Sequence, residues 1–311
     1  MYTRTPYCAY LCAMKYTTIR NNPKQFLALT SLTIEEFDGL VPIFSSHWSS
    51  WIRHFTLNGK PRQRRYSPKS DKLKLSDEEM LFFILYYHKN NPLQEAIAAS
   101  FDMTQDLANK LIHILMPLLN KSLAKWAPET NPQRLDNVLT EGEYYAGDCT
   151  ERRIQRDKHD QEHYYSGKKK AHSVKNFLIV SAIGMVVFLS NMVEGKRHDK
   201  KMAEELRLSI QRKITMGLDS GFRGLTTPES VKVEMPIRKP RNGELTDDQK
   251  AENKDMSSRR VIVENGISGC KRLRIVKDVI RLHGDKVKEL VFLTAVSIHN
   301  YRVFSRKTLC S

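Results

Sequence analysis

The sequence lacks the marks of several large protein classes. It has only five cysteines, and their one close pair, Cys8 and Cys12, has no histidine nearby, so neither a disulfide framework nor a zinc site is indicated. The longest apolar stretch, residues 177–193, is broken by serine and asparagine, which predicts two buried strands and no membrane span. No internal repeat or low-complexity segment stands out. These absences favour a globular protein with reduced thiols in a cytosolic or nuclear compartment.

The first residues also lack the pattern of a targeting signal. The segment "MYTRTPYCAYLCAMKY" has a single arginine and a short run rich in tyrosine, which makes a poor signal peptide. Residues 1–13 have no helical or strand period, and the pattern of a folded domain starts after Met14, which could itself be the initiator. We therefore expect residues 1–21 to form a poorly ordered extension.

Positive charge is what the sequence has in excess. Its 51 Lys and Arg against 35 Asp and Glu give a formal net charge of +16, and its pI is about 9.6. This charge predicts a polyanionic partner, of which nucleic acid is the commonest, although a merely basic cytosolic protein is the bland alternative. With 311 residues, the chain is long enough for two domains.

Residues 22–127 have a helical pattern. Thr33 with Glu36, and Ser76 with Glu79, have the spacing of capping boxes at the starts of two helices. The segment between these helices is strongly basic, so it is either an arm that contacts phosphates or a solvated linker, and the global charge favours the arm. The arginines expected to contact DNA there are Arg62, Arg64 and Arg65.

A second feature of this helical part is a pair of short helices. An apolar helix over 93–101, a tight turn, and a further helix from Thr104 make the arrangement of a helix-turn-helix. An ordinary helical hairpin fits the periodicity equally well. In a helix-turn-helix, the second helix would enter a groove of DNA, where Gln105 and Asn109 are the side chains best suited to reading base edges.

Residues 128–142, which are polar and contain two prolines, predict a linker between two domains. After it, residues 143–311 change to strands interleaved with helices, which is an α/β pattern with a partly antiparallel sheet. A charged segment that is poor in apolar residues, 239–258, is expected to be a loop. The expected strands are 144–148, 174–183, 186–193, 214–218 and 231–237, and the expected helices are 198–211 and 258–272.

Two aspartates in this second part, Asp148 and Asp219, each end a strand-like run. One such residue alone is more often a turn former than a ligand. A third acid, Glu264, lies in an expected helix, far from both in the chain, so only tertiary structure could bring the three together. If it does, their mutual repulsion favours Mg²⁺ or Mn²⁺, which hard carboxylate oxygens suit.

The expected helix around Glu264 carries Arg260 and Lys271 on the same face, because steps of four and seven residues return to one side of a helix. The alternative is an exposed stripe of ion pairs, worth only tenths of a kcal/mol. The apolar run 261–263 predicts a largely buried helix, which an idle charged stripe would not explain.

These segments together resemble one family. The motifs are "GDCTERRIQR" around the first acid, "YYSGKKKAHSVKN", "VEGKRHDKKM", "LDSGFRG" around the second acid, and the spacing Arg260, Glu264, Lys271. In this order they resemble a DDE transposase of the insertion-sequence-five and PIF/Harbinger-like superfamily, from roughly Asn22 to the C-terminus. One accessory position departs from the pattern, because Ser257 stands where insertion-sequence relatives often carry tyrosine.

The resemblance implies a fold and a chemistry. It implies an α/β, RNase H-like catalytic domain, a mixed sheet flanked by helices, preceded by an all-α helix-turn-helix domain at 22–127. Asp148, Asp219 and Glu264 would then be the catalytic residues and the ligands of two Mg²⁺ (or Mn²⁺) ions, for cleavage at terminal inverted repeats and strand transfer. The remaining residues expected to contact DNA phosphates are Lys168, Lys169, Lys170, Arg260 and Lys271.

Some alternatives stay open at this point. Asp199, in "KRHDKK", is a rival for the second acid, but its place at the start of an expected helix favours a cap. A transposase-derived DNA-binding protein or regulator that does not cut, or a stand-alone nuclease, would share the fold. The expected partner is double-stranded DNA, bound by a homodimer or higher oligomer, and no membrane partner is expected. The expected location is the cytoplasm at the nucleoid, or a nucleus if the host is eukaryotic.

Overall fold

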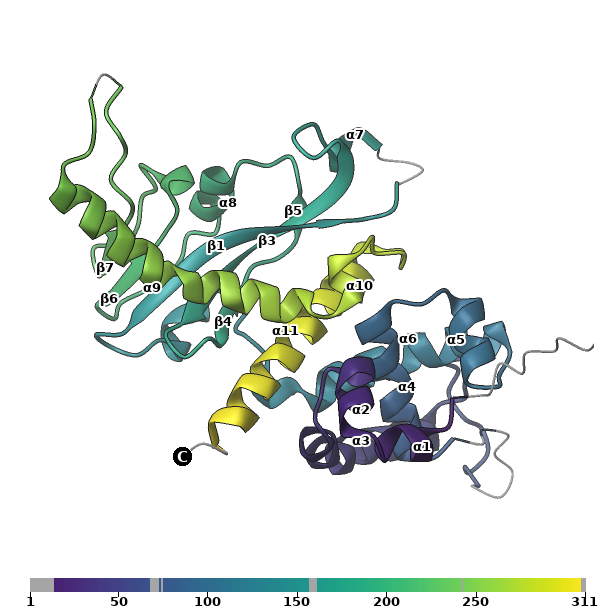
Figure 1. Ribbon diagram of the computed structural model, residues 1–311. Coiled ribbons are helices and arrows are strands. Elements are labelled where there is room, and N and C mark those ends of the chain that lie inside the picture. The colour runs from purple at the N-terminus through teal and green to yellow at the C-terminus, as the bar shows by residue number, and fades with distance from the viewer. Residues whose placement is uncertain (1–13, 68–72, 74, 157–160, 242, 309–311) are drawn as a thin grey trace, which may run out of the picture. The chain divides into compact units, whose positions relative to one another are not determined.

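The computed structural model describes residues 14–67, 73, 75–156, 161–241 and 243–308 (Figure 1). The chain divides into two compact units, residues 1–122 and 123–311. None of the helices in these ranges is both long enough and apolar enough to cross a membrane.

The first unit is all-helical. Its two long early helices begin with the predicted capping boxes, in which Thr33 and Ser76 each accept a hydrogen bond from the glutamate three residues later. Phe26 and Phe37 pack edge to face with ring centroids 5.1 Å apart in its core. The helices are α1 (Tyr16–Arg20), α2 (Pro23–Thr30), α3 (Ile34–His54), α4 (Asp77–Asn90), α5 (Gln94–Ser100) and α6 (Gln105–Ser122).

The start of the described chain is more ordered than the expected extension over 1–21. Residues 1–13 lie outside the described part, but α1 follows directly. Ile19 is buried, Tyr16 packs against Phe26, Phe37 and Phe82, and the backbone N–H of Met14 donates to the carbonyl of Ser100 at 2.6 Å. Aromatic packing therefore orders a segment whose local pattern is too short to predict a helix.

The second unit is built on a mixed sheet in the order β2-β3-β1-β6-β7, with β4 and β5 also paired to β3. β1 is antiparallel to β3 and parallel to β6, and β6 is parallel to β7. The coarse α/β prediction is confirmed, and the arrangement fits an RNase H-like domain. The strands are β1 (Tyr144–Arg153), β2 (Tyr165–Ser166), β3 (Ala171–Ser181), β4 (Val186–Leu189), β5 (Val193–Glu194), β6 (Ile214–Gly217) and β7 (Val231–Glu234).

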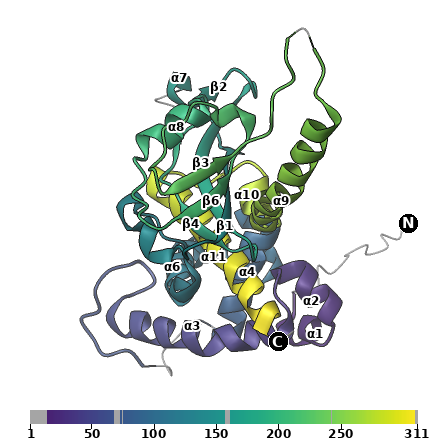
Figure 2. The same cartoon turned by 90° about the vertical axis from the view of Figure 1, so that its left-hand side faces the viewer.

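Helices cover both faces of this sheet (Figures 1 and 2). On one face Phe177 and Ile179 pack with Met202 of α8 in the main core. On the other face α9 lies so close to β3 that a Cβ on Gly266 would be 3.1 Å from Val180. The helices are α7 (Gln161–Tyr164), α8 (Asp199–Glu205), α9 (Asp247–Lys271), α10 (Arg274–Lys277) and α11 (Asp285–Thr308), with 3₁₀ turns η2 (Ala124–Trp126), η3 (Pro132–Val138) and η4 (Ser220–Phe222).

Two segments differ from the sequence expectation. Within 128–142, expected as a linker, η3 contributes Leu135, and Leu139 follows it into the core of the second unit. Within 239–258, expected as a loop, α9 already begins at Asp247, because Thr246 and Gln249 form a capping box. The polar, proline-containing composition of the first segment and the high charge of the second concealed local signals that fix a helical turn.

Candidate active site

The parallel pairing of β1 with β6 places two of the predicted acids side by side. Ala146 of β1 is in register with Gly217 of β6, and Asp148 and Asp219 each follow two residues later. Adjacent strands lie about 4.8 Å apart, so Asp148, within β1, and Asp219, just past the end of β6, are neighbours. Asp219 caps η4 by accepting the N–H of Ser220 at 2.7 Å, and its side chain is 53% exposed.

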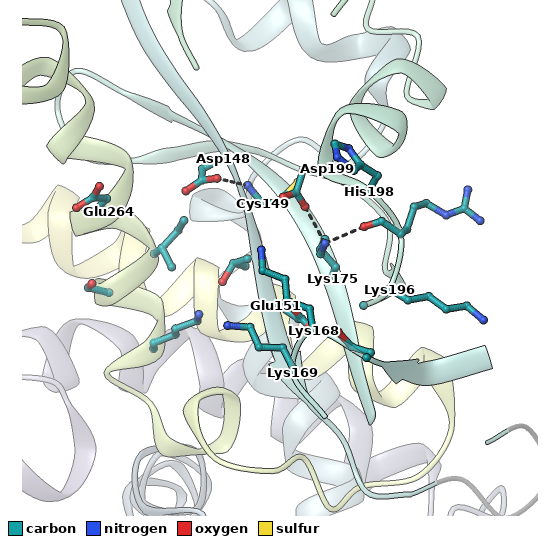
Figure 3. A pocket seen from close by; sticks show the side chains of 18 residues that line it. Asp148, Cys149, Glu151, Lys168, Lys169, Lys175, Lys196, His198, Asp199 and Glu264 are labelled. Carbon is teal, nitrogen blue, oxygen red and sulfur yellow. Dashed lines mark hydrogen bonds and ion pairs between the residues drawn. The ribbon is translucent and has the colours of Figure 1, made fainter. Parts of the chain in front are cut away.

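The third acid comes from α9, which crosses β1 and β3. A cavity of about 550 Å³ is lined by Asp148, Glu264 and Lys271, and in Figure 3 the carboxylate of Asp148 points toward the side on which Glu264 lies. Asp219 does not line this cavity but lies beside Arg260 of the same helix, with 3.8 Å between Nη1 and Oδ1. The three predicted acids are thus carried by three neighbouring elements.

The same helix is less buried than its apolar run predicts. Val261 is 45% exposed, and of the residues 261–263 only Val263 is buried. Glu264 is exposed, while Arg260 and Lys271 are partly buried. Glu264 and Lys271 line the cavity all the same, and Arg260 on the same side of the helix lies beside Asp219.

Burial raises the pKa of Asp148, and the nearby carboxylates of Asp219 and Asp199 raise it further. The N–H of Cys149, which donates to Asp148 at 2.7 Å, and the guanidinium of Arg260 oppose this but do not cancel it. Burial, with Arg152 and Lys169 nearby, lowers the pKa of Lys271. Asp148 therefore has less positive charge around it than its burial requires.

A divalent cation is the group that this donor set suits. Three carboxylates supply only hard oxygen ligands, which Mg²⁺ and Mn²⁺ prefer. Within the described ranges, however, no three His, Cys, Asp or Glu side chains already lie close enough to hold a metal ion. Asp219 would have to turn from Arg260 toward Asp148 to complete the set.

Asp199, the rival for the second acid, lines the same cavity but is already engaged. Lys175 of β3 donates to its Oδ1 at 2.7 Å and to the carbonyl of Arg197 at 2.8 Å. Lys175 is only 8% exposed, and Asp199 is the first residue of α8. The pair therefore fastens the start of α8 to the sheet, although the N-cap is His198 and Asp199 does not cap the helix as its position predicted.

Basic residues surround the cavity. Lys168 and Lys169 line it, as does Lys196, whose Nζ donates to the carbonyl of Glu162 at 2.9 Å. Lys170 lies in the same turn with a positive φ of 47° but does not line the cavity. Lys175 and Lys196 were not predicted from the sequence as residues of this site. The neighbouring Gly195 is the sequence feature that marks this part of the site, because a Cβ there would collide with Ser173 and Glu151 and the backbone must pass close to the sheet.

The residues predicted to contact DNA in the first unit have mixed surroundings. Gln105 and Asn109 of α6 both donate to Oε1 of Gln94 in α5, at 2.6 and 3.1 Å, so they brace the two helices. Arg62 donates through Nε to the carbonyl of Ile52 at 2.6 Å. Its guanidinium also lies 5.0 Å above the ring of Tyr66, whereas Arg64 and Arg65 are exposed.

Two comparisons relate the sequence to known proteins. A family model described as "DDE superfamily endonuclease" matches residues 147–300, a range that contains Asp148, Asp219 and Glu264. A relative from Microchaete diplosiphon, named "Probable transposase for insertion sequence element IS702", is 21% identical over 192 residues, which cover 62% of this chain and 68% of the relative.

The replacement Asp148→Asn should raise the thermal stability of the metal-free protein at neutral pH. A carboxyl whose folded pKa is raised contributes stability that is present below its ordinary value of 3.8 and is lost as pH rises through the folded pKa. The difference between variant and wild type in a pH series of melting curves should therefore vanish in acid. Asp199→Asn is the matched control, and it should instead lose stability because it leaves Lys175 without its carboxylate. A fall in stability for Asp148→Asn at pH 7 would contradict this account.

Arg62→Ala should destabilise the first unit by about 1–2 kcal/mol in urea denaturation, because it removes a charged hydrogen bond to the end of α3. The exposed controls Arg64→Ala and Arg65→Ala should change stability by less than about 0.5 kcal/mol. Each of these two variants should instead bind any duplex more weakly. The slope of log binding constant against log salt concentration should become shallower by about 0.9 for each. If Arg62→Ala weakened DNA binding but left stability unchanged, the structural role of Arg62 would be refuted.

Proposed function

We propose that the protein, whose residues 147–300 belong to the DDE superfamily of endonucleases, is a DNA transposase. The observation that carries the proposal is the register of β1 and β6, which sets Asp148 beside Asp219 where α9 brings Glu264 to the same edge. The reaction would be cleavage at terminal inverted repeats, followed by joining of the freed 3′-hydroxyl ends to target DNA. Its motifs resemble those of the insertion-sequence-five and PIF/Harbinger-like superfamily, which would be its group.

Asp148, Asp219 and Glu264 would hold two Mg²⁺ (or Mn²⁺) ions. Bound there, the ions would supply an activated nucleophile and charge stabilisation for in-line displacement at phosphorus. Arg260, freed from Asp219, and Lys271, in the cavity beside Asp148, would bind the phosphates that flank the scissile bond. Both cations lie close to the proposed metal ligands, where they would hold the DNA in position. Direct in-line attack at phosphorus requires no covalent intermediate.

The basic side chains around the cavity would hold the DNA across this site. Lys168, Lys169 and Lys170 are exposed in the turn between β2 and β3, and phosphate contacts from such lysines carry no sequence preference. In the first unit, α5 and α6 would act as the helix-turn-helix that selects the repeat, with Gln105 and Asn109 near the base edges. Arg64 and Arg65 would add contacts to the backbone, and a homodimer or higher oligomer would pair two ends.

One observation favours a second candidate, a DNA-binding regulator that does not cut. Arg260 lies 3.8 Å from Asp219, and no ready cluster of three ligands exists among the described residues. In this reading, Arg260 would replace the cation permanently. Metal-dependent nicking distinguishes the two candidates, and strand-transfer products distinguish a transposase from a stand-alone nuclease.

Asp148→Asn, Asp219→Asn and Glu264→Gln should each reduce Mg²⁺-dependent cleavage of a duplex by about 10²–10³-fold or more. Each removes a carboxylate ligand of the ions that would stabilise the charge developing in the transition state. Binding of the same duplex should be unchanged, as measured by fluorescence anisotropy. Each should also lose the rise in melting temperature that Mg²⁺ gives the wild type, which tests the site without relying on activity.

Asp199→Asn is the control in this series, since its carboxylate is occupied by Lys175. It should keep the response to Mg²⁺ and most of the cleavage at a temperature where it is folded. If Asp219→Asn still cuts and Asp199→Asn does not, the second acid is Asp199 and the proposed site is wrong.

A further inference from the structure

The segment between β7 and α9 projects from the second unit. Its described residues, 236–241 and 243–246, rise beyond the sheet as the green loop in Figures 1 and 2, and we call them the β7–α9 projection. Its strand-side limb has three exposed basic residues, Arg238, Lys239 and Arg241. Nothing in the proposed catalytic mechanism uses them.

The projection leaves the sheet in line with the candidate active site. Gly217 of β6 is in register with Glu234 of β7, and the N–H of Leu218 donates to the carbonyl of Glu234 at 2.9 Å. Pro236 follows Glu234 by two residues, as Asp219 follows Gly217 and Asp148 follows Ala146, so the three residues continue from paired positions on β7, β6 and β1. Two strand spacings put the root of the projection about 10 Å from Asp148 along this edge.

The root of the projection is held by specific hydrogen bonds. Arg223, in the turn after Asp219, donates to the carbonyl of Pro236 at 2.9 Å. The side-chain amide of Asn253 in α9 clamps Ile237 from both sides, accepting its N–H at 2.6 Å and donating to its carbonyl at 2.9 Å. The projection is therefore braced to the two elements that carry Asp219 and Glu264.

Charge is divided between the two limbs. The basic residues lie on the limb that comes from β7, whereas Asp247 and Asp248 lie in the first turn of α9, where the helix dipole favours acids. Lys239 meets Glu244 at 3.6 Å, but the side chains are 64% and 82% exposed, so water and salt screen this pair. On the helix side Asp247 is paired with Lys250 at 2.9 Å, so the unpaired positive charge lies on the strand-side limb, and that limb is the one that would attract a polyanion.

We propose that the β7–α9 projection is an arm that binds the phosphates of duplex DNA on one side of the scissile phosphate. This inference rests on the proposed function, which places the scissile phosphate at Asp148. At a rise of 3.4 Å per base pair, the 10 Å between Asp148 and the root of the arm corresponds to about three base pairs. The arm itself extends further, so its contacts begin about three base pairs from the cut.

The test compares wild type with Arg238→Gln/Lys239→Gln/Arg241→Gln on a duplex that extends 15 base pairs to each side of the cleavage position. The variant should bind at least about tenfold more weakly near 0.1 M salt, and its log–log salt slope should be flatter by about 2 to 3. Trimming the duplex to two base pairs beyond the cut on one side, and on that side only, should abolish the difference between wild type and variant.

The matched control neutralises three exposed basic residues at the opposite end of β6, in Arg134→Gln/Arg207→Gln/Lys213→Gln. This variant has the same change in net charge and should bind the long duplex within about twofold of wild type. The proposed arm would be refuted by equal losses of binding in the two triple variants. It would also be refuted if the difference between wild type and the arm variant persisted whichever side of the duplex is trimmed.

The outcome separates the arm from the proposed function. If wild type binds DNA but cuts no duplex with Mg²⁺, the proposed transposase fails, while the salt slopes still test the arm. If the arm variant cuts a duplex trimmed on both sides at the wild-type rate but shows no loss of binding to the long duplex, the proposed arm is refuted and the proposed catalytic site stands.

Discussion

The parallel pairing of β1 with β6 is the constraint on which the candidate site depends. It aligns Asp148 with Asp219 at one edge of the sheet, and the next pairing, of β6 with β7, aligns Pro236 with both. A slip of one residue in either register would turn one of these positions to the other face. The close approach of α9, which Gly266 permits against Val180, then sets the place of Glu264.

The folded chain balances most of the negative charge gathered at this edge, but not all of it. Asp199 is matched by Lys175, and Asp219 by Arg260, whereas the pKa of Asp148 stays raised by burial and by its neighbours. Asp148, in the middle of β1, is the acid whose burial is not offset by its neighbours. This distribution is what a cation site requires, because a site already neutralised by its own side chains would gain little from an ion.

Sequence patterns could predict the strands that lead to Asp148 and Asp219, because both residues follow apolar runs, and the helix that carries Glu264 with Arg260 and Lys271. They could not predict contacts that depend on strand register, such as the pairing of Lys175 with Asp199 across β3 and α8. Arg62 shows the same limit, since its place in a basic run gives no sign that it closes the end of α3. The early start of α9 was missed for another reason: Thr246 and Gln249 have capping-box spacing, but the charge around them predicts a loop.

The most direct test of the central claim is an anomalous difference map from crystals of the protein soaked in Mn²⁺. The account predicts manganese between the carboxylates of Asp148, Asp219 and Glu264, with Arg260 no longer in contact with Asp219. Manganese held by Asp199 in place of Asp219, or no manganese at Asp148 at millimolar concentration, would contradict it.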